Sequence, residues 1–200
     1  MHLAADTYAP PLIAAFHTSS ALHLVVEYAP CGSLWDLMTH EGGASHTGRI
    51  DEAQALWWTK QMIPAIAWVH EQGYAHRDVK PHNFLLYPDC RLKITDFGSA
   101  APLVQDQVPL EYCGLPVGTP DYIAPEILHH AESLFASGPE PQPYTSAVDW
   151  WSLGVVLFEL VVGSPPFFAD TIAETYDKIK RYDMTSLASS SREIAELVQS

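Results

Sequence analysis

The spacing of apolar residues predicts one long helix in the first half of the chain. Between residues 52 and 72, apolar side chains recur at steps of three and four, as on one face of a helix. These positions are Ala55, Trp58, Met62, Ile66 and Val69. We expect Asp51 to cap the N-terminus of this helix and Pro64 to kink it.

Strands are predicted where apolar and β-branched residues lie between turn residues. Residues 22–28 (LHLVVEY) form one such run. Residues 84–86 and 92–94 form two more, around a turn at residues 88–91, which indicates a hairpin. Residues 1–20 are expected to be irregular.

Helices are predicted to dominate the rest of the chain. They are expected at residues 34–39, 146–162, 172–181 and 191–199, the first of them capped by Ser33. Residues 101–125 and 133–144 have no strong period and are predicted as loops. Because the strands come early and the helices late, the expected fold class is α+β.

The composition indicates a globular chain and narrows the choice of partners. With 200 residues, 48% of them hydrophobic, the chain can bury one core. Its formal net charge of −14 repels nucleic acids and anionic membranes and favours basic partners. The alternative is that the acidity serves solubility alone. Either way, we expect no nucleic-acid partner.

The number and spacing of the cysteines and the lengths of the apolar runs indicate the cellular compartment of the protein. The three cysteines are far apart and odd in number, which argues against a disulfide framework and a zinc site. No basic region typical of a secretory signal follows Met1. The most apolar stretch, residues 153–162, is too short to span a bilayer. We expect no transmembrane segment and a cytoplasmic location.

Three short motifs carry the candidate chemistry. His-Arg-Asp at residues 76–78 is followed by Lys80 and Asn83, Asp-Phe-Gly stands at residues 96–98, and Ala-Pro-Glu at residues 124–126. Each tripeptide alone is weak, because its acidic residue can equally be a surface carboxylate. Together, in this order, the set resembles the signature of the protein kinase superfamily. The resemblance covers residues 12–197 and implies a protein-kinase-like fold, mostly the helical C-lobe with the hinge and the last N-lobe strands.

The resemblance implies a role for each polar residue of these motifs. Asp78 would accept or orient the proton of the acceptor hydroxyl, and Lys80 would neutralise charge near the γ-phosphate. Asn83 would complete the catalytic set and, with Asp96, bind Mg²⁺, because this ion prefers oxygen ligands. The predicted hairpin would turn the chain back so that both side chains face one metal site. Lysine at position 80 is typical of serine/threonine kinases.

Further residues resemble the nucleotide site of this family. Residues 26–29 look like the hinge between the two kinase lobes. There, the Glu27 carbonyl and the Ala29 amide would bind adenine, with Leu85 beneath the ring. ATP and Mg²⁺ are therefore the implied cofactors. Ordinary sheet core is the alternative interpretation of this strand.

Several details resemble the AGC group of serine/threonine kinases. These are GTPDYIAPE at residues 118–126 and DWWSLG at residues 149–154. The runs DFGSAA and LPVGTP are most similar to the citron and Rho-kinase-related branch. Within the second motif, Asp149 would bond the backbone near His76.

The chain also departs from the family pattern. It has no Gly-rich loop and no paired lysine ahead of the hinge, and its first lysine is Lys60. The expected organisation is thus a partial kinase domain. Residues 1–29 would be the end of the N-lobe and the hinge, and residues 30–200 a C-lobe truncated before its end. The arginine that usually pairs with Glu126 would lie beyond it.

Local departures bear on specificity and regulation. Ser33 and His82 stand where kinases with basic substrates carry acidic residues, which weakens the expectation of an arginine before the phosphoacceptor. Leu115 occupies the usual phosphorylation position. Arg77 would then lack the phosphate group that it binds in related kinases.

The sequence thus predicts a serine/threonine protein kinase that transfers the γ-phosphoryl group of ATP to protein hydroxyls. Because the phosphate clamp is incomplete, we expect this chain alone to show little or no turnover. The expected partners are a protein substrate and a regulatory or scaffolding protein. Two alternatives stay open: a non-catalytic, pseudokinase-like binding module, and a longer gene whose upstream sequence supplies the absent parts.

Overall fold

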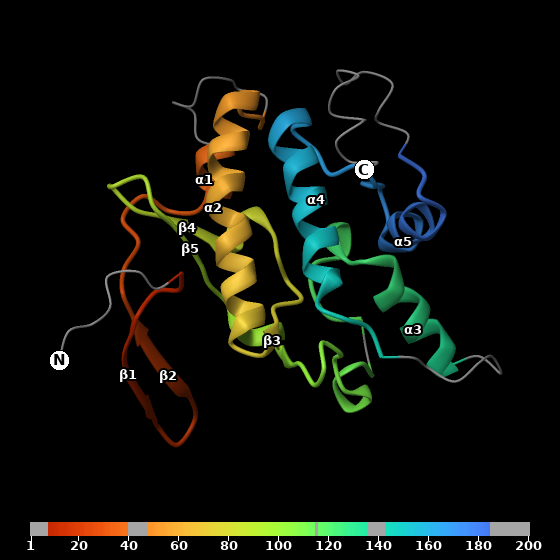
Figure 1. Cartoon of the computed structure of the whole chain (residues 1–200), viewed down its shortest axis with the longest axis horizontal. Coiled ribbons are helices and arrows are strands. Elements are labelled where there is room, and N and C mark those ends of the chain that lie inside the picture. Colours follow the sequence, from red (N-terminus) through yellow and green to blue (C-terminus); the bar gives the residue numbers. More distant parts are fainter. Residues whose placement is uncertain (1–7, 40–47, 115, 136–142, 185–200) are drawn as a thin grey trace.

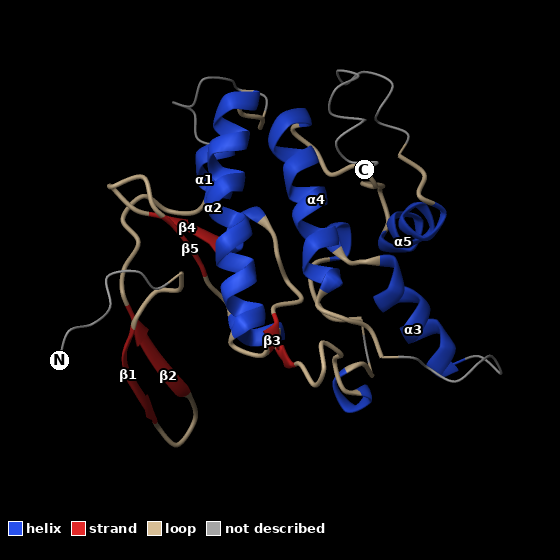
Figure 2. Ribbon diagram, in the orientation of Figure 1, coloured by secondary structure: helices blue, strands red, loops and turns tan. Residues whose placement is uncertain are grey.

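The structure is a computed structural model that describes residues 8–39, 48–114, 116–135 and 143–184. Its helices are α1 (Leu34–Thr39), α2 (Glu52–Glu71), α3 (Pro125–Phe135), α4 (Ala147–Val162) and α5 (Ile172–Arg181). Its strands are β1 (Leu12–His17), β2 (Leu22–Val26), β3 (Tyr74–Ala75), β4 (Phe84–Leu86), β5 (Leu92–Ile94) and β6 (Ala101–Pro102). Figure 2 shows this mixture of helix and strand, which confirms the α+β class.

The core lies around two long helices near the middle of the molecule. α2 and α4 run side by side, with α3 and α5 beyond α4 (Figure 1). Both central helices contribute residues that are at most 2% exposed to one apolar cluster, namely Met62, Ile66, Val69, Val156 and Leu160. Burial of such side chains is the main source of folding free energy.

The strands form three antiparallel pairs, β1 with β2, β3 with β6, and β4 with β5. In the last pair, Phe84 lies opposite Ile94, and both side chains are fully buried. This confirms the predicted hairpin at residues 84–94. Its register brings the chain after β5 back beside the chain before β4, which is the geometry that the metal-site hypothesis requires.

The predicted helix caps are confirmed. The Ser33 hydroxyl accepts the Asp36 N–H at 3.2 Å, and the Asp36 carboxylate accepts the Ser33 N–H at 2.7 Å. This reciprocal pair begins α1. The Asp51 carboxylate accepts the Gln54 N–H at 2.9 Å and begins α2. Pro64 lies inside α2, and the helix continues past it.

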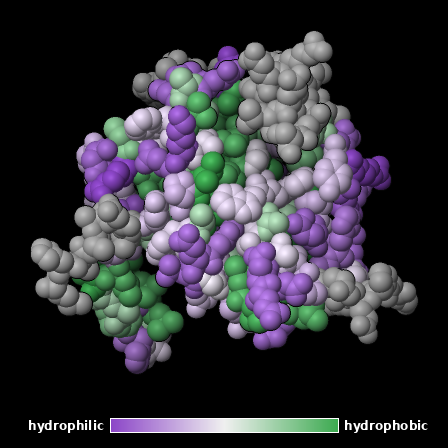
Figure 3. All heavy atoms as spheres, viewed as in Figure 1, coloured by the Kyte–Doolittle hydropathy of each residue, from purple (hydrophilic) through white to green (hydrophobic). Residues whose placement is uncertain are grey.

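The β1–β2 hairpin is apolar but exposed on both faces. Leu12, Leu22 and Leu24 are 60%, 86% and 71% exposed. Figure 3 shows the resulting apolar surface, on the side of the molecule away from α3 and α5. These side chains therefore contribute little to the core.

Some predicted boundaries are wrong. Residues 12–17 were expected to be irregular, but they form β1, because pairing with β2 satisfies a backbone whose sequence lacks an alternating pattern. The expected loop at residues 101–125 contains β6 and turns of 3₁₀ helix, which are too short to show a period. α3 was missed and extends into the predicted loop at residues 133–144. The predicted helix at residues 191–199 lies outside the described residues.

Most other predicted elements agree closely with the structure, although the strand expected at residues 22–28 ends at Val26. α5 has the expected bounds, α2 is one residue shorter than predicted, and α4 begins one residue later. Among the helices in the described part of the chain, none combines the length and the apolarity needed to cross a bilayer.

Candidate active site

The Asp78 carboxylate is the centre of a closed network of polar contacts. Lys80 Nζ donates to Asp78 Oδ2 at 2.8 Å and to the Thr119 hydroxyl at 2.7 Å. Thr119 in turn donates to Asp78 Oδ1 at 2.8 Å. The Asn83 amide donates to the Asp78 carbonyl at 2.8 Å and to Oδ2 at 3.1 Å. Asp78 is only 8% exposed, so this network fixes the direction of its carboxylate.

The three residues expected to be catalytic are therefore brought together. Asp78, Lys80 and Asn83 come from one loop that follows β3 and ends in a turn of 3₁₀ helix, Pro81–Asn83. Thr119 comes from the distant GTPDY segment, 41 positions away from Asp78. Sequence analysis did not identify Thr119 as a contact of Asp78. The signal that could have found it is its place directly after Gly118.

Asp149 holds the backbone of this loop from the first turn of α4. Its carboxylate accepts the N–H groups of His76 and Arg77, each at 2.7 Å. This confirms the predicted contact near His76. The same carboxylate contacts His70 Nε2 at 2.7 Å, which sequence analysis did not foresee. Asp149 is fully buried, and these contacts satisfy a carboxylate that would otherwise be costly to bury.

The His76 side chain joins the catalytic loop to the Asp-Phe-Gly segment. Its ring is fully buried, and Nε2 lies 2.9 Å from the Thr95 carbonyl. The Asp78 N–H points to His76 Nδ1 at 3.3 Å. A ring that accepts at Nδ1 and donates at Nε2 explains both contacts. The Phe97 ring packs edge-on against His76, with centroids 5.3 Å apart.

The two predicted metal ligands, Asn83 and Asp96, flank the β4–β5 hairpin: Asn83 directly precedes β4, and Asp96 follows shortly after β5. The Thr95 N–H donates to the Asn83 carbonyl at 2.9 Å, so Asp96 begins directly beside Asn83. Asp96 is exposed and has a left-handed backbone, with φ of 63°. Because the Asn83 amide nitrogen is directed at Asp78, its oxygen faces elsewhere. One amide oxygen and one exposed carboxylate fit the hard oxygen ligands that Mg²⁺ takes alongside water and phosphate.

The residues assigned to the nucleotide lie beside this hairpin. Leu85 is half-buried on β4 and lies opposite Lys93 of β5. Lys93 Nζ forms an ion pair of 2.5 Å with the Glu27 carboxylate. Ala29 follows, and its carbonyl accepts the Gly32 N–H at 3.4 Å. The segment after β2 is thus joined to the hairpin by Lys93, a contact that sequence analysis did not predict.

The ion pair between Glu27 and Lys93 lies next to Tyr87, and the pKa values of Glu27 and Tyr87 are both shifted. The Lys93 ammonium, by its hydrogen bond, lowers the pKa of the Glu27 carboxyl. Burial, together with the adjacent Glu27, raises the pKa of Tyr87 to about 12. Both groups therefore stay in their ordinary charge states at neutral pH.

A second buried polar contact joins the GTPDY segment to α4. The Tyr122 hydroxyl donates to the Glu159 carboxyl at 2.6 Å. Burial raises the pKa of Glu159 from its ordinary value to about 7; the hydrogen bond from Tyr122 opposes this shift and the charge of Asp121 adds to it. Burial also raises the pKa of Tyr122. Sequence analysis missed this pair, whose members stand 37 positions apart.

The local departures noted in the sequence are visible in the structure. His82 is exposed and stacks on Trp35, with centroids 4.5 Å apart. Partial desolvation of the ring, followed by the charge of Lys80, lowers the pKa of His82. Glu126 stands in the first turn of α3 and is half-buried, a position where the helix N-terminus stabilises a carboxylate. Leu115 lies outside the described residues.

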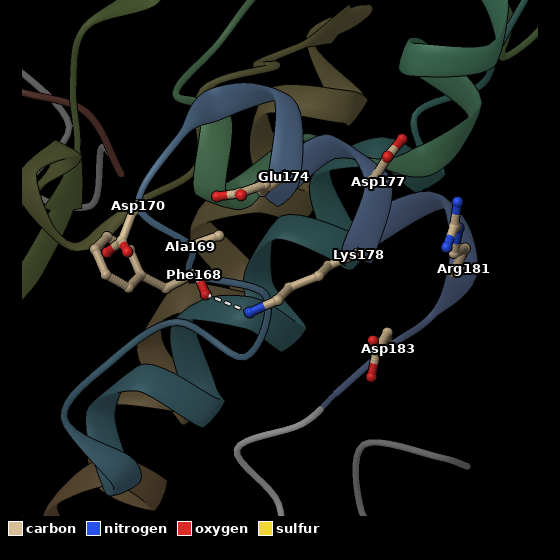
Figure 4. Close-up of a pocket in the computed structure, with 8 residues that line it drawn as sticks. All are labelled: Phe168, Ala169, Asp170, Glu174, Asp177, Lys178, Arg181 and Asp183. Carbon is tan, nitrogen blue, oxygen red and sulfur yellow. Dashed lines mark hydrogen bonds between the residues drawn. The ribbon is translucent and has the colours of Figure 1, made fainter.

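A pocket of about 510 Å³ lies on a different part of the molecule, along α5. Figure 4 shows Glu174 and Asp177 among its lining residues, with Lys178 bonded to the Phe168 carbonyl at 2.9 Å. None of the predicted site residues lines this pocket. The candidate site is therefore defined by the polar network around Asp78 rather than by the α5 pocket.

Comparison with known proteins agrees with this geometry. The protein kinase domain family matches residues 10–200. Citron Rho-interacting kinase of Mus musculus is 36% identical over 173 residues, covering 86% of this chain and 8% of that protein. Rho-associated protein kinase 1 of Homo sapiens is 36% identical over 182 residues, covering 91% of this chain and 12% of that protein.

A Rho-associated protein kinase of Caenorhabditis briggsae gives a similar result, 37% identity over 86% of this chain and 13% of that protein. The chain thus spans about a tenth of the length of these relatives. Members of this family use ATP and Mg²⁺. The match over nearly all residues and the network around Asp78 lead to one assignment: the chain belongs to the protein kinase family, on its serine/threonine-specific side, with the Rho-associated and citron kinases of the AGC group as relatives.

Proposed function

We propose that this chain's own residues transfer the γ-phosphoryl group of ATP to serine or threonine hydroxyls of a protein substrate. The single observation that carries the proposal is the network around Asp78. One buried carboxylate is held by Lys80, Thr119 and Asn83, all within 3.1 Å of it. Such a fixed carboxylate can accept a proton from a substrate hydroxyl group that comes within hydrogen-bond distance of it.

The proposed reaction divides the work between two side chains, Asp78 and Lys80. The substrate hydroxyl oxygen forms a bond to the γ-phosphorus, the bond from that phosphorus to the β-phosphate oxygen breaks, and ADP leaves with the electron pair. Asp78 takes the hydroxyl proton. Lys80 places its positive charge next to the transferred group, where charge stabilisation and positioning supply most of the rate.

The metal and the nucleotide have assigned residues in this proposal. Asn83 and Asp96 would hold Mg²⁺, which neutralises charge on the phosphates when bound. The Glu27 carbonyl, the Ala29 amide and Leu85 would hold the adenine. The ion pair between Glu27 and Lys93 supports this, because it ties the residues around Glu27 to the hairpin that carries Leu85.

The proposal also includes the organisation and setting of the chain. Residues 1–29 form the end of an N-lobe with its hinge, and residues 30–200 belong to a C-lobe. A protein substrate and a regulatory or scaffolding protein are the proposed partners, with no nucleic acid. A cytoplasmic location fits a chain that requires ATP.

The test uses the purified chain with magnesium-ATP and a generic protein substrate. Binding is measured by calorimetry with and without Mg²⁺, and transfer by radiolabelled phosphate. Asp78→Asn should abolish any transfer and leave nucleotide binding intact, whereas Asp96→Asn should remove the magnesium dependence of binding. Asp89→Asn, on the exposed turn between β4 and β5, is the matched control.

The outcomes separate the two hypotheses. Transfer that survives Asp78→Asn at the original rate would refute the assignment of Asp78. Magnesium-dependent binding with very slow transfer would agree with the expected weak turnover of this chain. Absence of both binding and transfer would favour the non-catalytic binding module.

A further inference from the structure

Arg77 has a buried side chain that the proposed reaction does not use. The residue is 8% exposed and has a left-handed backbone, with φ of 64°. Its guanidinium donates from Nε to the Ser99 carbonyl at 2.7 Å. It also donates from Nη1 to the Tyr112 carbonyl at 2.6 Å and to the Tyr144 hydroxyl at 2.9 Å. These three acceptors are uncharged.

The three acceptors lie on parts of the chain that are far apart in sequence. Ser99 follows the Asp-Phe-Gly motif, Tyr112 stands 35 positions after Arg77, and Tyr144 stands 67 positions after it. A planar guanidinium with several fixed N–H donors can bond such groups at once. Arg77 therefore joins both ends of the segment 99–112 to the catalytic loop.

Tyr144 is itself fixed in place. It is 4% exposed, and its ring meets His130 edge-on at 6.0 Å. Its carbonyl accepts the Val108 N–H at 2.8 Å. Burial raises the pKa of the Tyr144 phenol, so the group remains neutral at physiological pH. Its hydroxyl is thus a rigid acceptor for Arg77.

The chain around Tyr144 makes two more contacts with the same segment. The Ser146 hydroxyl donates to the Asp106 carboxylate at 2.6 Å, and Thr145 forms a β-bridge with Gln107. A few residues on, Asp149 accepts the backbone N–H of Arg77. The start of α4 therefore holds Arg77 by its backbone and, through Tyr144, by its side chain.

We propose that Tyr144 is a positioning residue: its hydroxyl, with the Ser99 and Tyr112 carbonyls, holds Arg77 and so keeps residues 99–112 against the catalytic loop without a phosphate group. The proposal rests on the proposed function, because it concerns regulation of the same site. It means that the segment reaches its ordered arrangement in the unmodified chain. Phosphorylation of this segment is then not required to order it.

The test measures local opening in the full chain, without nucleotide or metal. The chain is produced unphosphorylated, which its intact mass verifies, and amide hydrogen exchange is followed over residues 99–113. Tyr144→Phe removes the hydroxyl and keeps the ring. Because the lost hydrogen bond is buried and its donor is charged, exchange in this segment should become about 10- to 100-fold faster.

The control and a spectroscopic signal make the test specific. Tyr112→Phe also removes a hydroxyl, but Arg77 bonds the Tyr112 carbonyl, so exchange should stay within about twofold of the parent chain. The Arg77 Nε–H resonance should exchange slowly with solvent in the parent chain and in Tyr112→Phe. It should exchange faster in Tyr144→Phe, although the packing of the ring is retained.

Three results would overturn the proposal. One is unchanged exchange over residues 99–113 in Tyr144→Phe. Another is an equal increase throughout α2, which would mean that Tyr144 supports overall stability rather than this segment. The third is protection of the segment that appears only after phosphorylation. Because no nucleotide is present in this experiment, none of these results bears on the proposed catalytic role of Asp78. The phosphoryl-transfer assay tests that role separately.

Discussion

The Asp149 carboxylate accepts the backbone N–H of Arg77 at 2.7 Å, across 72 positions of sequence. It accepts the N–H of His76 at the same distance. The residue after these two is Asp78, the proposed catalytic base. A buried side chain of α4 thus fixes the backbone directly before Asp78. This couples the packing of the core to the geometry of the site.

Asp149→Asn should strongly destabilise the fold. An amide offers one acceptor oxygen and places an NH₂ group against the N–H donors that now share the carboxylate, so one buried donor loses its partner. We expect the free energy of unfolding in urea to fall by about 2–4 kcal/mol. Asp89→Asn, where an exposed carboxylate pairs with Arg91, should leave it nearly unchanged. Equal effects in the two variants would contradict the anchoring role.

Gly118→Ala should disturb the contact between Thr119 and Asp78. Gly118 has φ of 107°, and an added Cβ would collide with the Arg77 carbonyl, which is backbone and cannot turn aside. We expect a loss of about 1–3 kcal/mol in the free energy of unfolding. Gly114→Ala is the matched control, because within the described part of the chain no atom beyond its sequence neighbours lies within 4 Å of the position its Cβ would take. The idea fails if Gly118→Ala is as stable as Gly114→Ala.

Glu159 should make stability depend on pH. Burial raises its pKa from 4.5 to about 7 in the folded protein. Across that interval the folded chain holds a proton that the unfolded chain has lost, so the free energy of unfolding falls as the pH rises. The total loss is about 3 kcal/mol by pH 8, and the stabilisation is fully present below pH 4.5.

Glu159→Gln removes this titration and keeps an acceptor for Tyr122. Urea unfolding at pH 5 and pH 8 should show a smaller difference between the two conditions in Glu159→Gln than in the parent chain. Glu174→Gln, on the exposed face of α5, should retain the parent difference. A parent chain with the same stability at both values of pH would rule out the raised pKa.

Two leucines should respond differently to the same truncation. Leu34 of α1 is fully buried, whereas Leu24 of β2 is 71% exposed. Leu34→Ala should lower the free energy of unfolding by about 2–5 kcal/mol, because it leaves a cavity. Leu24→Ala should change it by less than about 0.5 kcal/mol. Urea denaturation of both variants checks this, and a large effect at Leu24 would mean that the hairpin is covered in solution.

Local chemistry explains why much of the fold could be predicted. The caps at Ser33 and Asp51 act over three residues, and the apolar spacing of α2 repeats within one helix, so both are visible in sequence. β1 was missed because its sequence shows no alternating pattern, and it is a strand only through its pairing with β2. β3 and β6 are each two residues long and exist only because the fold brings them together.

The sequence by itself determined the identity and order of the proposed catalytic groups, Asp78, Lys80, Asn83 and Asp96, because these residues are close along the chain and their motifs are short-range. Only the tertiary structure decided how Thr119 reaches Asp78 and how Tyr144 reaches Arg77. For Asp149, the resemblance had pointed to the backbone near His76, and the structure showed which carboxylate oxygen accepts which N–H group. These contacts join positions 41, 72 and 67 residues apart. The physical reason is that each of these hydrogen bonds depends on the packing of segments that are distant in sequence, which places the two partners within 3 Å and leaves no periodic trace in the sequence.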